Sequence, residues 1–314
     1  MHVAVRHRQL VLLGRDDPRT PLATIPCEDI GLLVVDEVQS TLTQAALVTL
    51  MEEGAAVLVC GRNHLPAGML LPLSSHTEVV WRVNAQIAAK KPLLKQLWRQ
   101  LVQAKVRAQA ANLPPDLPAR RRLDVLAREV RSGDPANVEA QAAKVYWQAL
   151  FATSSPLDKG GIEGGTSFHR DPDGDGVNAL LNYGYAVLRA AVARALVSAG
   201  LLPVLGIHHA NRANAFCLAD DLMEPLRAFA DARVCEIVRR EPPELTPATK
   251  RPLLELLTLE VRCADQTGPL MVALHRMVAS LVRCYAGESK RLEIPEALTG
   301  GADLPDSPAP DLPC

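Results

Sequence analysis

The patterning of the chain changes from strand to helix in the stretch EVVWRVNAQIAAKKPLLKQLWRQLVQAKVRAQAA, residues 78–111. This stretch contains no glycine, and its single proline, Pro92, predicts a break or kink near Lys91. Before it the apolar residues form short β-branched runs, and after it they recur at helical spacing. We therefore expect the α+β class, with a small N-terminal β-rich domain followed by a larger, all-helical C-terminal domain.

The part of the chain before this stretch contains four apolar segments of strand length. Residues 3–5 and 10–13 flank a polar segment in the manner of a short hairpin. Residues 31–36 and 55–60 are apolar runs bounded by glycine, aspartate or alanine, as buried strands are. Between these two runs, the apolar side chains of residues 41–51 recur at helical spacing, which predicts one helix.

The part of the chain after residue 77 is predicted to be helical. Besides the helices of the opening stretch, the expected helices cover residues 116–131, 137–152, 178–198, 220–239, 247–263 and 269–286. The predicted domain boundaries are 1–75 for the β-rich domain, 76–84 for a linker, 85–292 for the helical domain and 293–314 for a disordered acidic tail. The Gly-rich residues 154–165 lack the Gly-Lys-Ser/Thr ending of a phosphate-binding loop, so they are interpreted as a mobile insertion.

Length and composition restrict the class of protein. With 314 residues, of which 48% are hydrophobic, the chain can form a globular protein of two domains. No uninterrupted apolar run is long enough to span a membrane, and the N-terminus carries no secretory signal. The 7 cysteines form no Cys-x-x-Cys pair, which predicts reduced thiols, a cytoplasmic protein and no structural zinc.

Charge is distributed unevenly, although the formal net charge is only −1. Residues 82–144 contain 13 Lys or Arg against 5 Asp or Glu, whereas residues 293–314 contain 5 acids and no Lys or Arg. A basic central region suits a polyanion such as DNA or RNA. Solvated helix faces are also often rich in Lys and Arg, so charge alone leaves both interpretations open.

The candidate chemistry is concentrated around Gly206-Ile207-His208-His209, which is followed by Asp221 and Glu224. A third acid, Glu139, lies upstream in an alanine-rich predicted helix. Ligands of the types Glu, His and Glu/Asp describe a site for a hard divalent cation, Mg²⁺ or Mn²⁺, and such sites most often perform phosphoryl chemistry. Adjacent histidines point in different directions in most backbones, so we expect only one of the two to be a ligand.

Each of these residues also has an ordinary structural interpretation. Glu139 can be an exposed helix residue, Asp221 can cap a helix, and Glu224 can form a surface ion pair with Arg227 three residues later. A polar and aromatic group in the next upstream helix can orient phosphates or form a hydrogen-bond network between helices. Its members are Asn178, Asn182, Tyr183 and Tyr185.

Three ordered motifs, within residues 133–147, 168–185 and 206–225, resemble the CRISPR adaptation integrase, the universal first CRISPR-associated protein, in its type II-like branch. The resemblance covers residues 3 to about 290. It implies that the β-rich domain forms a homodimer and that the helical domain is catalytic. It also implies that the metal ligands are Glu139, His209 and Glu224, and that Asp221 is a further catalytic acid near the Mg²⁺ or Mn²⁺.

The resemblance further implies a metal-dependent DNA endonuclease and integrase. It would insert short duplex DNA, a new spacer, into the CRISPR array by attack of a 3′-hydroxyl on a phosphodiester, in defence against viruses and plasmids. The implied partners are double-stranded DNA (the prespacer and the CRISPR repeat), a second copy of the chain, the small companion adaptation protein in a heterohexamer, and the type II effector machinery. No membrane is implied.

Two departures from the family pattern leave alternatives open. Relative to the family we expect the chain to begin one strand late, and residues 154–165 do not resemble the family pattern. A non-catalytic DNA-binding scaffold and a transposon-borne integrase are therefore kept beside the active enzyme. The candidates for sugar–phosphate contacts are basic residues, chosen chiefly on charge: Lys90, Lys91, Lys95, Arg99, Lys105, Arg107 and Arg170.

Overall fold

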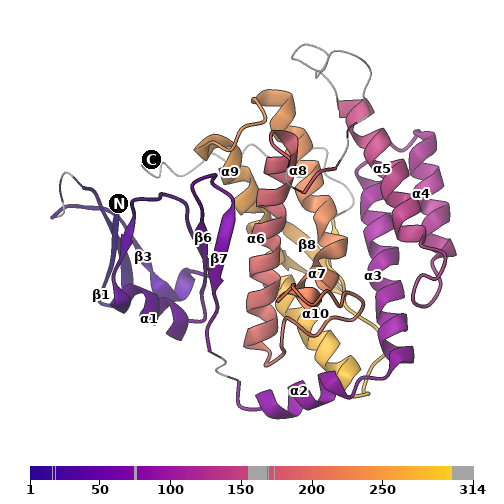
Figure 1. Cartoon of the computed structure of the whole chain (residues 1–314), viewed down its shortest axis with the longest axis horizontal. Coiled ribbons are helices and arrows are strands. Elements are labelled where there is room, and N and C mark those ends of the chain that lie inside the picture. The colour runs from indigo at the N-terminus through magenta and orange to yellow at the C-terminus, as the bar shows by residue number, and fades with distance from the viewer. Residues whose placement is uncertain are drawn as a thin grey trace. The chain divides into compact units, whose positions relative to one another are not determined.

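The structure, a computed structural model, describes residues 1–298 apart from positions 16, 18, 74, 75, 155–167, 169 and 173. Within this part the chain divides into two compact units, one over Met1–Ser75 and one over His76–Ala297 (Figure 1). The predicted insertion from residue 155 to 165 and the predicted tail from residue 299 onward lie outside the described residues. None of the helices in the described part is long and apolar enough to cross a membrane.

The first unit contains two sheets. The four-stranded sheet has the order β3-β2-β1-β5, and the three-stranded sheet has the order β4-β6-β7. The strands are β1 (His2–Arg6), β2 (Gln9–Leu13), β3 (Pro21–Pro26), β4 (Leu32–Val35), β5 (Thr41–Leu42), β6 (Ala56–Cys60) and β7 (Pro66–Leu70). The β1–β2 hairpin and the β4 and β6 runs confirm the strands expected from the sequence.

Helix α1 (Gln44–Glu52) supplies one side of the core of the first unit. The Thr43 side chain caps it by accepting a hydrogen bond from the Ala46 N–H at 3.2 Å. Leu50 of α1 is fully buried with Leu10 of β2 and Val57 of β6. The helix predicted over residues 41–51 is confirmed from Gln44 onward, whereas Thr41–Leu42 form strand β5 instead.

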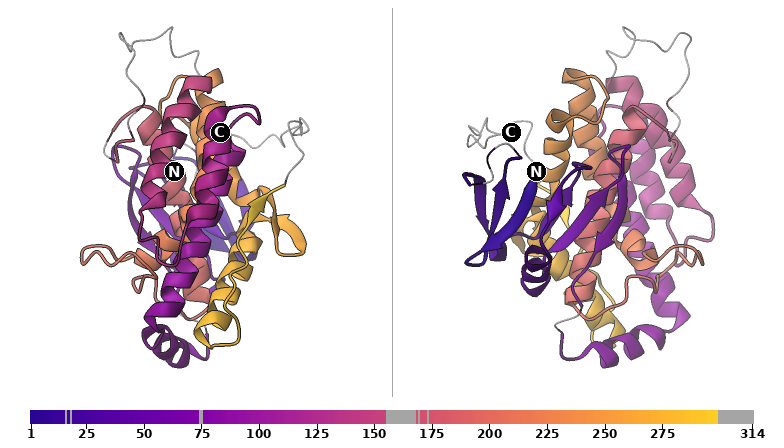
Figure 2. Two further views of the ribbon diagram at one scale, coloured as in Figure 1. Left: turned by 90° about the vertical axis from the view of Figure 1, so that its right-hand side faces the viewer. Right: turned by 60° about the vertical axis from the view of Figure 1, so that its left-hand side comes forward.

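The second unit is mostly helical. Its helices are α2 (Val79–Ile87), α3 (Lys91–Ala111), α4 (Pro118–Glu129), α5 (Val138–Ser154), α6 (Val177–Ser198), α7 (Cys217–Met223), α8 (Arg227–Arg240), α9 (Pro247–Leu254) and α10 (Leu270–Tyr285), with short 3₁₀ turns η3 (Glu224–Leu226) and η4 (Glu255–Thr258). Helix α6 contacts α7, α8, α9 and α10, while α3, α4 and α5 pack on one another (Figures 1 and 2). The alanines of α6 allow this close packing because they leave its backbone accessible to its neighbours.

Prolines fix two helix boundaries near the site. Pro92 lies in the first turn of α3, where a missing N–H costs nothing, and the predicted break therefore falls between α2 and α3. Most of the segment predicted as a linker is helix α2. Pro225 interrupts the predicted helix 220–239 and produces η3 between α7 and α8.

The second unit also contains a three-stranded sheet, so the expectation of an all-helical domain was wrong at residues 260–263. There β8 (Glu260–Cys263) pairs with β9 (Gln266–Pro269) and β10 (Glu296–Ala297). Val261 and Cys263 are buried while their neighbours are exposed, which is strand periodicity. The turn after β8 places Ala264 at a φ of 56°. Because this position holds alanine and not the glycine or asparagine typical of tight hairpin turns, the hairpin could not be predicted from the sequence.

Candidate active site

Two glutamates converge on one lysine inside the second unit. Lys105 of α3 donates from Nζ to Glu139 Oε1 of α5 at 2.6 Å and to Glu224 Oε2 of η3 at 2.5 Å. The Lys105 and Glu224 side chains are 12% and 6% exposed, so the cluster is enclosed. Glu139 is 34 positions and Glu224 is 119 positions from Lys105 in the sequence, and the fold brings both carboxylates to its ammonium group.

Local chain geometry places Glu139 at the start of its helix. The Asp134 carboxylate accepts hydrogen bonds from the N–H groups of Val138, at 2.9 Å, and Glu139, at 3.0 Å. Asp134 and Asn137 both adopt positive φ, which closes the turn that precedes α5. Glu139 therefore lies in the first turn of α5, where the helix dipole favours a carboxylate.

Glu224 is held in its ionised form by two cations. Arg227 Nε donates to Glu224 Oε1 at 3.0 Å, and Lys105 contacts the other oxygen. Burial alone would raise the pKa of Glu224, but the charges of Arg227 and Lys105 more than offset it and hold this pKa at about 2. Burial likewise opposes the charge of Lys105, and Glu224 and Glu139 raise its pKa nevertheless. The cluster is therefore charged on both sides at neutral pH.

Asp221 organises the loop that carries the two histidines. It is fully buried, and its carboxylate accepts the N–H groups of Ile207 at 2.5 Å, His208 at 2.9 Å and His209 at 3.2 Å. The same carboxylate lies 2.6 Å from His209 Nδ1. Because both oxygens are already engaged, Asp221 orients His209 and the loop, and Nε2 is the imidazole nitrogen left for a ligand.

The two histidines have different surroundings. His208 stacks on Trp98 of α3, with ring centroids 4.2 Å apart and an interplanar angle of 4°. His209 meets Trp98 edge-on, and its side chain is 41% exposed. The hydrogen bond with Asp221 raises the pKa of His209 despite burial, and the charges of Asp221, Glu224 and Glu139 raise it further. His209 is therefore held by Asp221, and the negative charge of the two glutamates favours its protonated form.

Gly206 is required where the loop begins. A Cβ atom at this position would lie 2.2 Å from the His209 carbonyl oxygen and 2.9 Å from Asp221 Oδ2. No side chain fits these distances, so only glycine allows the loop to close over Asp221. The Gly-Ile-His-His sequence is thus explained by packing as well as by chemistry.

A buried network centred on Asp231 of α8 lies behind Arg227. Asp231 is 1% exposed and accepts hydrogen bonds from the hydroxyls of Tyr146, at 3.0 Å, and Tyr185, at 2.5 Å. The Arg227 guanidinium lies 4.6 Å from the centroid of the Tyr185 ring. Burial raises the pKa of Asp231 to about 6, although both tyrosine hydrogen bonds oppose the shift. The network supports Arg227, which in turn holds Glu224.

Only part of this network was predictable from the sequence. Tyr185 was selected from the sequence among residues that can orient phosphates or form a hydrogen-bond network. Asp231 could not be recognised as a buried residue, because one acid in a predicted helix is ordinarily exposed. Arg170 approaches the same Tyr185 ring at 5.4 Å and donates to the side-chain oxygens of Asn178 and Asn182. The motif residue Arg170 is therefore close to Arg227 through a shared aromatic ring.

Among the described residues no group of three His, Cys, Asp or Glu side chains is already arranged around one ion position. The Lys105 ammonium lies between the two glutamates. The donor types nevertheless fit a hard divalent cation, since two carboxylate oxygens converge on one cationic centre. Glu139, Glu224 and His209 are the residues that could hold such an ion.

The candidate DNA contacts fall into three groups. Lys105 is bound to Glu139 and Glu224, and Arg170 is half-buried. The remaining candidates are exposed on α3 and the turn before it: Lys90, Lys91, Lys95, Arg99 and Arg107. Sequence charge could not separate Lys105 from the others, because burial depends on which helix face meets α5 and η3.

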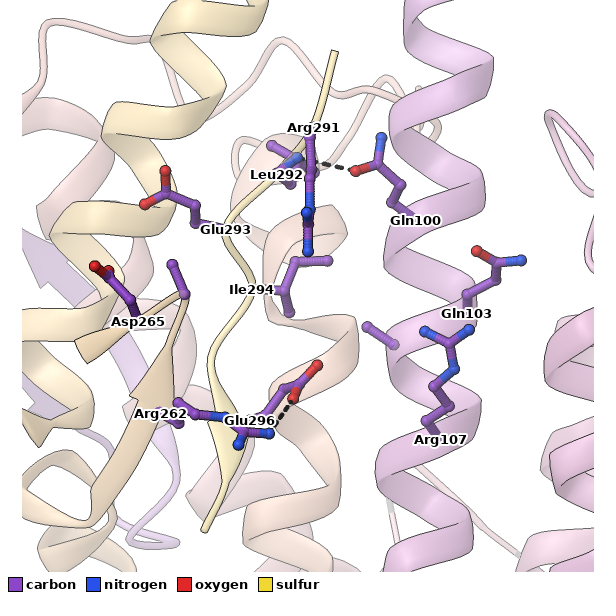
Figure 3. A pocket seen from close by; sticks show the side chains of 12 residues that line it. Gln100, Gln103, Arg107, Arg262, Asp265, Arg291, Leu292, Glu293, Ile294 and Glu296 are labelled. Carbon is purple, nitrogen blue, oxygen red and sulfur yellow. Dashed lines mark hydrogen bonds and ion pairs between the residues drawn. The ribbon is translucent and has the colours of Figure 1, made fainter. Parts of the chain in front are cut away.

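Another face of α3 borders a groove of about 630 Å³ (Figure 3). Gln100, Gln103 and Arg107 line it from α3, and the β8–β9 turn and the segment before β10 form the opposite wall. Arg262 pairs with Glu296 across this wall at 3.1 Å, with both side chains about half exposed. The groove holds basic and acidic residues side by side and contains none of the residues of the Lys105 cluster.

Comparison with known sequences gives a consistent result. The family model "CRISPR associated protein Cas1" matches residues 1–245. The "CRISPR-associated endonuclease Cas1" of Neisseria meningitidis serogroup C (strain 8013) is 38% identical over 301 residues, covering 94% of this chain and 93% of that protein. The "CRISPR-associated endonuclease Cas1 2" of Pyrobaculum aerophilum is 29% identical over 290 residues, covering 87% and 92% of the two chains.

Solved structures share the fold. A casposase bound to its integration product superposes with a TM-score of 0.73 at 20% identity, covering 93% of this chain and 90% of the other. A Cas1 protein from Thermotoga maritima superposes with a TM-score of 0.66 at 16% identity, covering 91% and 95%. Both the β-rich first unit and the helical second unit therefore follow an arrangement known from this group of proteins.

Proposed function

Because the chain belongs to the CRISPR-associated protein Cas1 family, as its three motifs predicted, we propose that it is the DNA endonuclease and integrase of CRISPR adaptation. The observation that carries the proposal is the convergence of Glu139 and Glu224 on one cationic position. A phosphoryl-transfer site needs such an acidic position to hold a divalent cation next to the phosphate.

Glu139, Glu224 and the Nε2 atom of His209 would hold Mg²⁺ or Mn²⁺. The bound cation would polarise the scissile phosphodiester and lower the pKa of the attacking hydroxyl. Asp221 fixes the imidazole through Nδ1, which leaves Nε2 free of that contact, and Arg227 keeps the Glu224 carboxylate ionised and oriented. Positioning of this kind removes much of the barrier, because the reacting groups meet without further reorganisation.

The reaction exchanges one phosphodiester for another. The 3′-hydroxyl of a short DNA duplex attacks a phosphodiester of the repeat, a new P–O bond forms, and the 3′-oxygen of the target strand leaves. No nucleotide cofactor is needed, since the number of phosphodiester bonds is unchanged. With water as the nucleophile, the same site would cleave DNA.

The proposed partners follow from family membership. Related folds occur in structures titled as Cas6-RT-Cas1–Cas2 complexes, which pair a Cas1 protein with Cas2. We extend this to the present chain and propose a homodimer through the first unit, a heterohexamer with the small companion protein, and binding of prespacer and repeat DNA. The exposed basic residues of α3 are consistent with contacts to a phosphate backbone.

Strand transfer tests the proposal directly. A short duplex with free 3′ ends is incubated with a supercoiled plasmid that carries a repeat, the companion protein and Mn²⁺. We expect metal-dependent joining by the wild type and a loss of at least about 10²-fold in Glu139→Ala. DNA binding without joining in both proteins would favour a non-catalytic scaffold. Equal joining to a plasmid without a repeat would favour a transposon-type integrase.

A further inference from the structure

We propose that Lys105 is a built-in competitor for the divalent cation: its ammonium occupies the cation position between Glu139 and Glu224 in the metal-free protein and must leave when the metal binds. The inference rests on the proposed function, because it assigns those two glutamates to the metal. It adds a residue that the three motifs do not contain and that was selected from sequence only as a DNA contact.

The geometry identifies the shared position. One nitrogen, Lys105 Nζ, lies 2.6 Å from Glu139 Oε1 and 2.5 Å from Glu224 Oε2. Arg227 binds the remaining oxygen of Glu224, so Oε2 is the oxygen that faces Glu139. An ammonium has three donors and can bridge two carboxylates, but a divalent cation needs the same two oxygens. The two cations cannot occupy that position together.

The surroundings of Lys105 argue against an ordinary structural ion pair. Its neighbours Val102 and Val106 on α3 are fully buried, so an apolar side chain could pack at this position. Burying an ion pair there costs desolvation that an apolar residue would avoid. Two glutamates facing each other in an enclosed site would, however, repel and separate. The ammonium keeps them converged, which preserves the cation position when no metal is bound.

Lys105 also has room to change partners. A lysine ammonium is a compact charge on a flexible four-carbon chain, unlike the rigid fork of arginine. Gln109 lies one turn further along the same face of α3, and among the buried side-chain nitrogens and oxygens of the described residues its Oε1 is the one without a hydrogen-bond partner. This oxygen offers an acceptor to an ammonium displaced from the glutamates.

Mn²⁺ binding tests the proposal without any measurement of activity. Calorimetric titration of the full chain with Mn²⁺ alone compares the wild type with Lys105→Met, which keeps the length but removes the charge. We expect the variant to bind Mn²⁺ about tenfold more tightly, because the site no longer has to release a competing ammonium. Lys144→Met, at an exposed position of the helix that carries Glu139, is the matched control and should bind as the wild type does. Equal or weaker binding by Lys105→Met would overturn the inference.

A measurement on the wild type covers the case in which Lys105→Met does not fold. Lysine acylation is followed by mass spectrometry with and without Mn²⁺, and modification of Lys105 should rise when Mn²⁺ is present. An unchanged Lys105 signal would contradict the competition.

Glu139→Gln distinguishes a failure of the proposed metal site from a failure of the competition. If Mn²⁺ binds the wild type and this variant equally, the proposed metal site itself fails. If Glu139→Gln loses Mn²⁺ while Lys105 behaves as Lys144 does, only the competition fails.

Discussion

Helix α3 presents charged side chains to two very different environments. On one side Lys105 is enclosed between Glu139 and Glu224 at hydrogen-bond distance. On another side Arg107 faces the open groove, whose far wall carries the half-exposed pair Arg262–Glu296 (Figure 3). The residue types are the same on both sides, so the difference lies in burial and in how many partners share one charge.

This difference decides what each side can do. An exposed ion pair contributes only about 0–1 kcal/mol, because water and salt replace its partners easily. An enclosed cluster must stay balanced, because removing one member leaves a charge without compensation. The Lys105 side therefore suits the binding of one defined cation, and the groove side suits weak and exchangeable contacts.

Removal of one carboxylate from each side gives the largest expected contrast. Glu224→Gln should destabilise the protein by about 3 kcal/mol at pH 7, because two buried cations lose their partner. Glu296→Gln should change stability by less than about 1 kcal/mol. Since the folded pKa of Glu224 is about 2, the stabilisation is present above its unfolded pKa and is lost as the pH falls through 2. Urea denaturation at pH 7 and pH 3 measures both effects, and equal losses in the two variants would contradict the comparison.

Asp231 should show the opposite pH dependence. Its folded pKa of about 6 lies above the unfolded value near 3.8, so the folded state prefers the protonated form. Its contribution is most favourable below pH 4 and is lost as the pH rises through 6, by about 3 kcal/mol in total. Asp231→Asn removes the titration. The stability of the wild type relative to this variant should therefore fall between pH 4 and pH 7, and a constant difference would show that Asp231 is ionised throughout.

Two glycines extend the comparison to the backbone. Gly206→Ala places a methyl group against the His209 carbonyl and Asp221, so the loop must shift, at a cost of about 2 kcal/mol. Gly268→Ala, in the sheet that borders the groove, meets nothing within 4 Å and should cost less than about 1 kcal/mol. Thermal unfolding compares the two. If Gly206→Ala unfolds at the wild-type temperature, the loop is not held as tightly as its contacts with Asp221 imply.

The fold was largely predictable because its periodicities are strong. The hairpin of residues 3–13, helix α1 and the start of α3 near Pro92 each followed from local patterning. The β8–β10 sheet did not, because β8 lies directly after helical residues and its partner β10 is more than thirty residues away. Local patterns cannot report a pairing at that distance, and the Ala264 turn lacks the usual glycine or asparagine.

The acids and the histidine of the candidate site were visible in the sequence, but their neighbours were not. Glu139, His209 and Glu224 were selected as residue types that suit a metal, and the folded chain brings the two glutamates onto one ammonium group. Lys105 was selected with other basic residues as a DNA contact, and Asp231 was not singled out at all. Both lie where packing between α3, α5, η3 and α8 buries a charge, and that packing depends on tertiary contacts that no single segment encodes.

The smallest expected effect belongs to the groove and tests whether its open side binds DNA at all. Arg107 and Arg291 line it, and neither has an ion-pair partner among the residues that the structure describes. If both touch phosphates, Arg107→Gln with Arg291→Gln should lower the slope of log K against log salt by about 2 and weaken duplex binding at low salt. Arg251→Gln, on the exposed side of α9, is the control. Fluorescence anisotropy over a salt series measures the slopes. A slope equal to that of the wild type would place the DNA elsewhere, and the two sides of α3 would then differ in kind: one side binds a cation, and the other is an ordinary solvated surface.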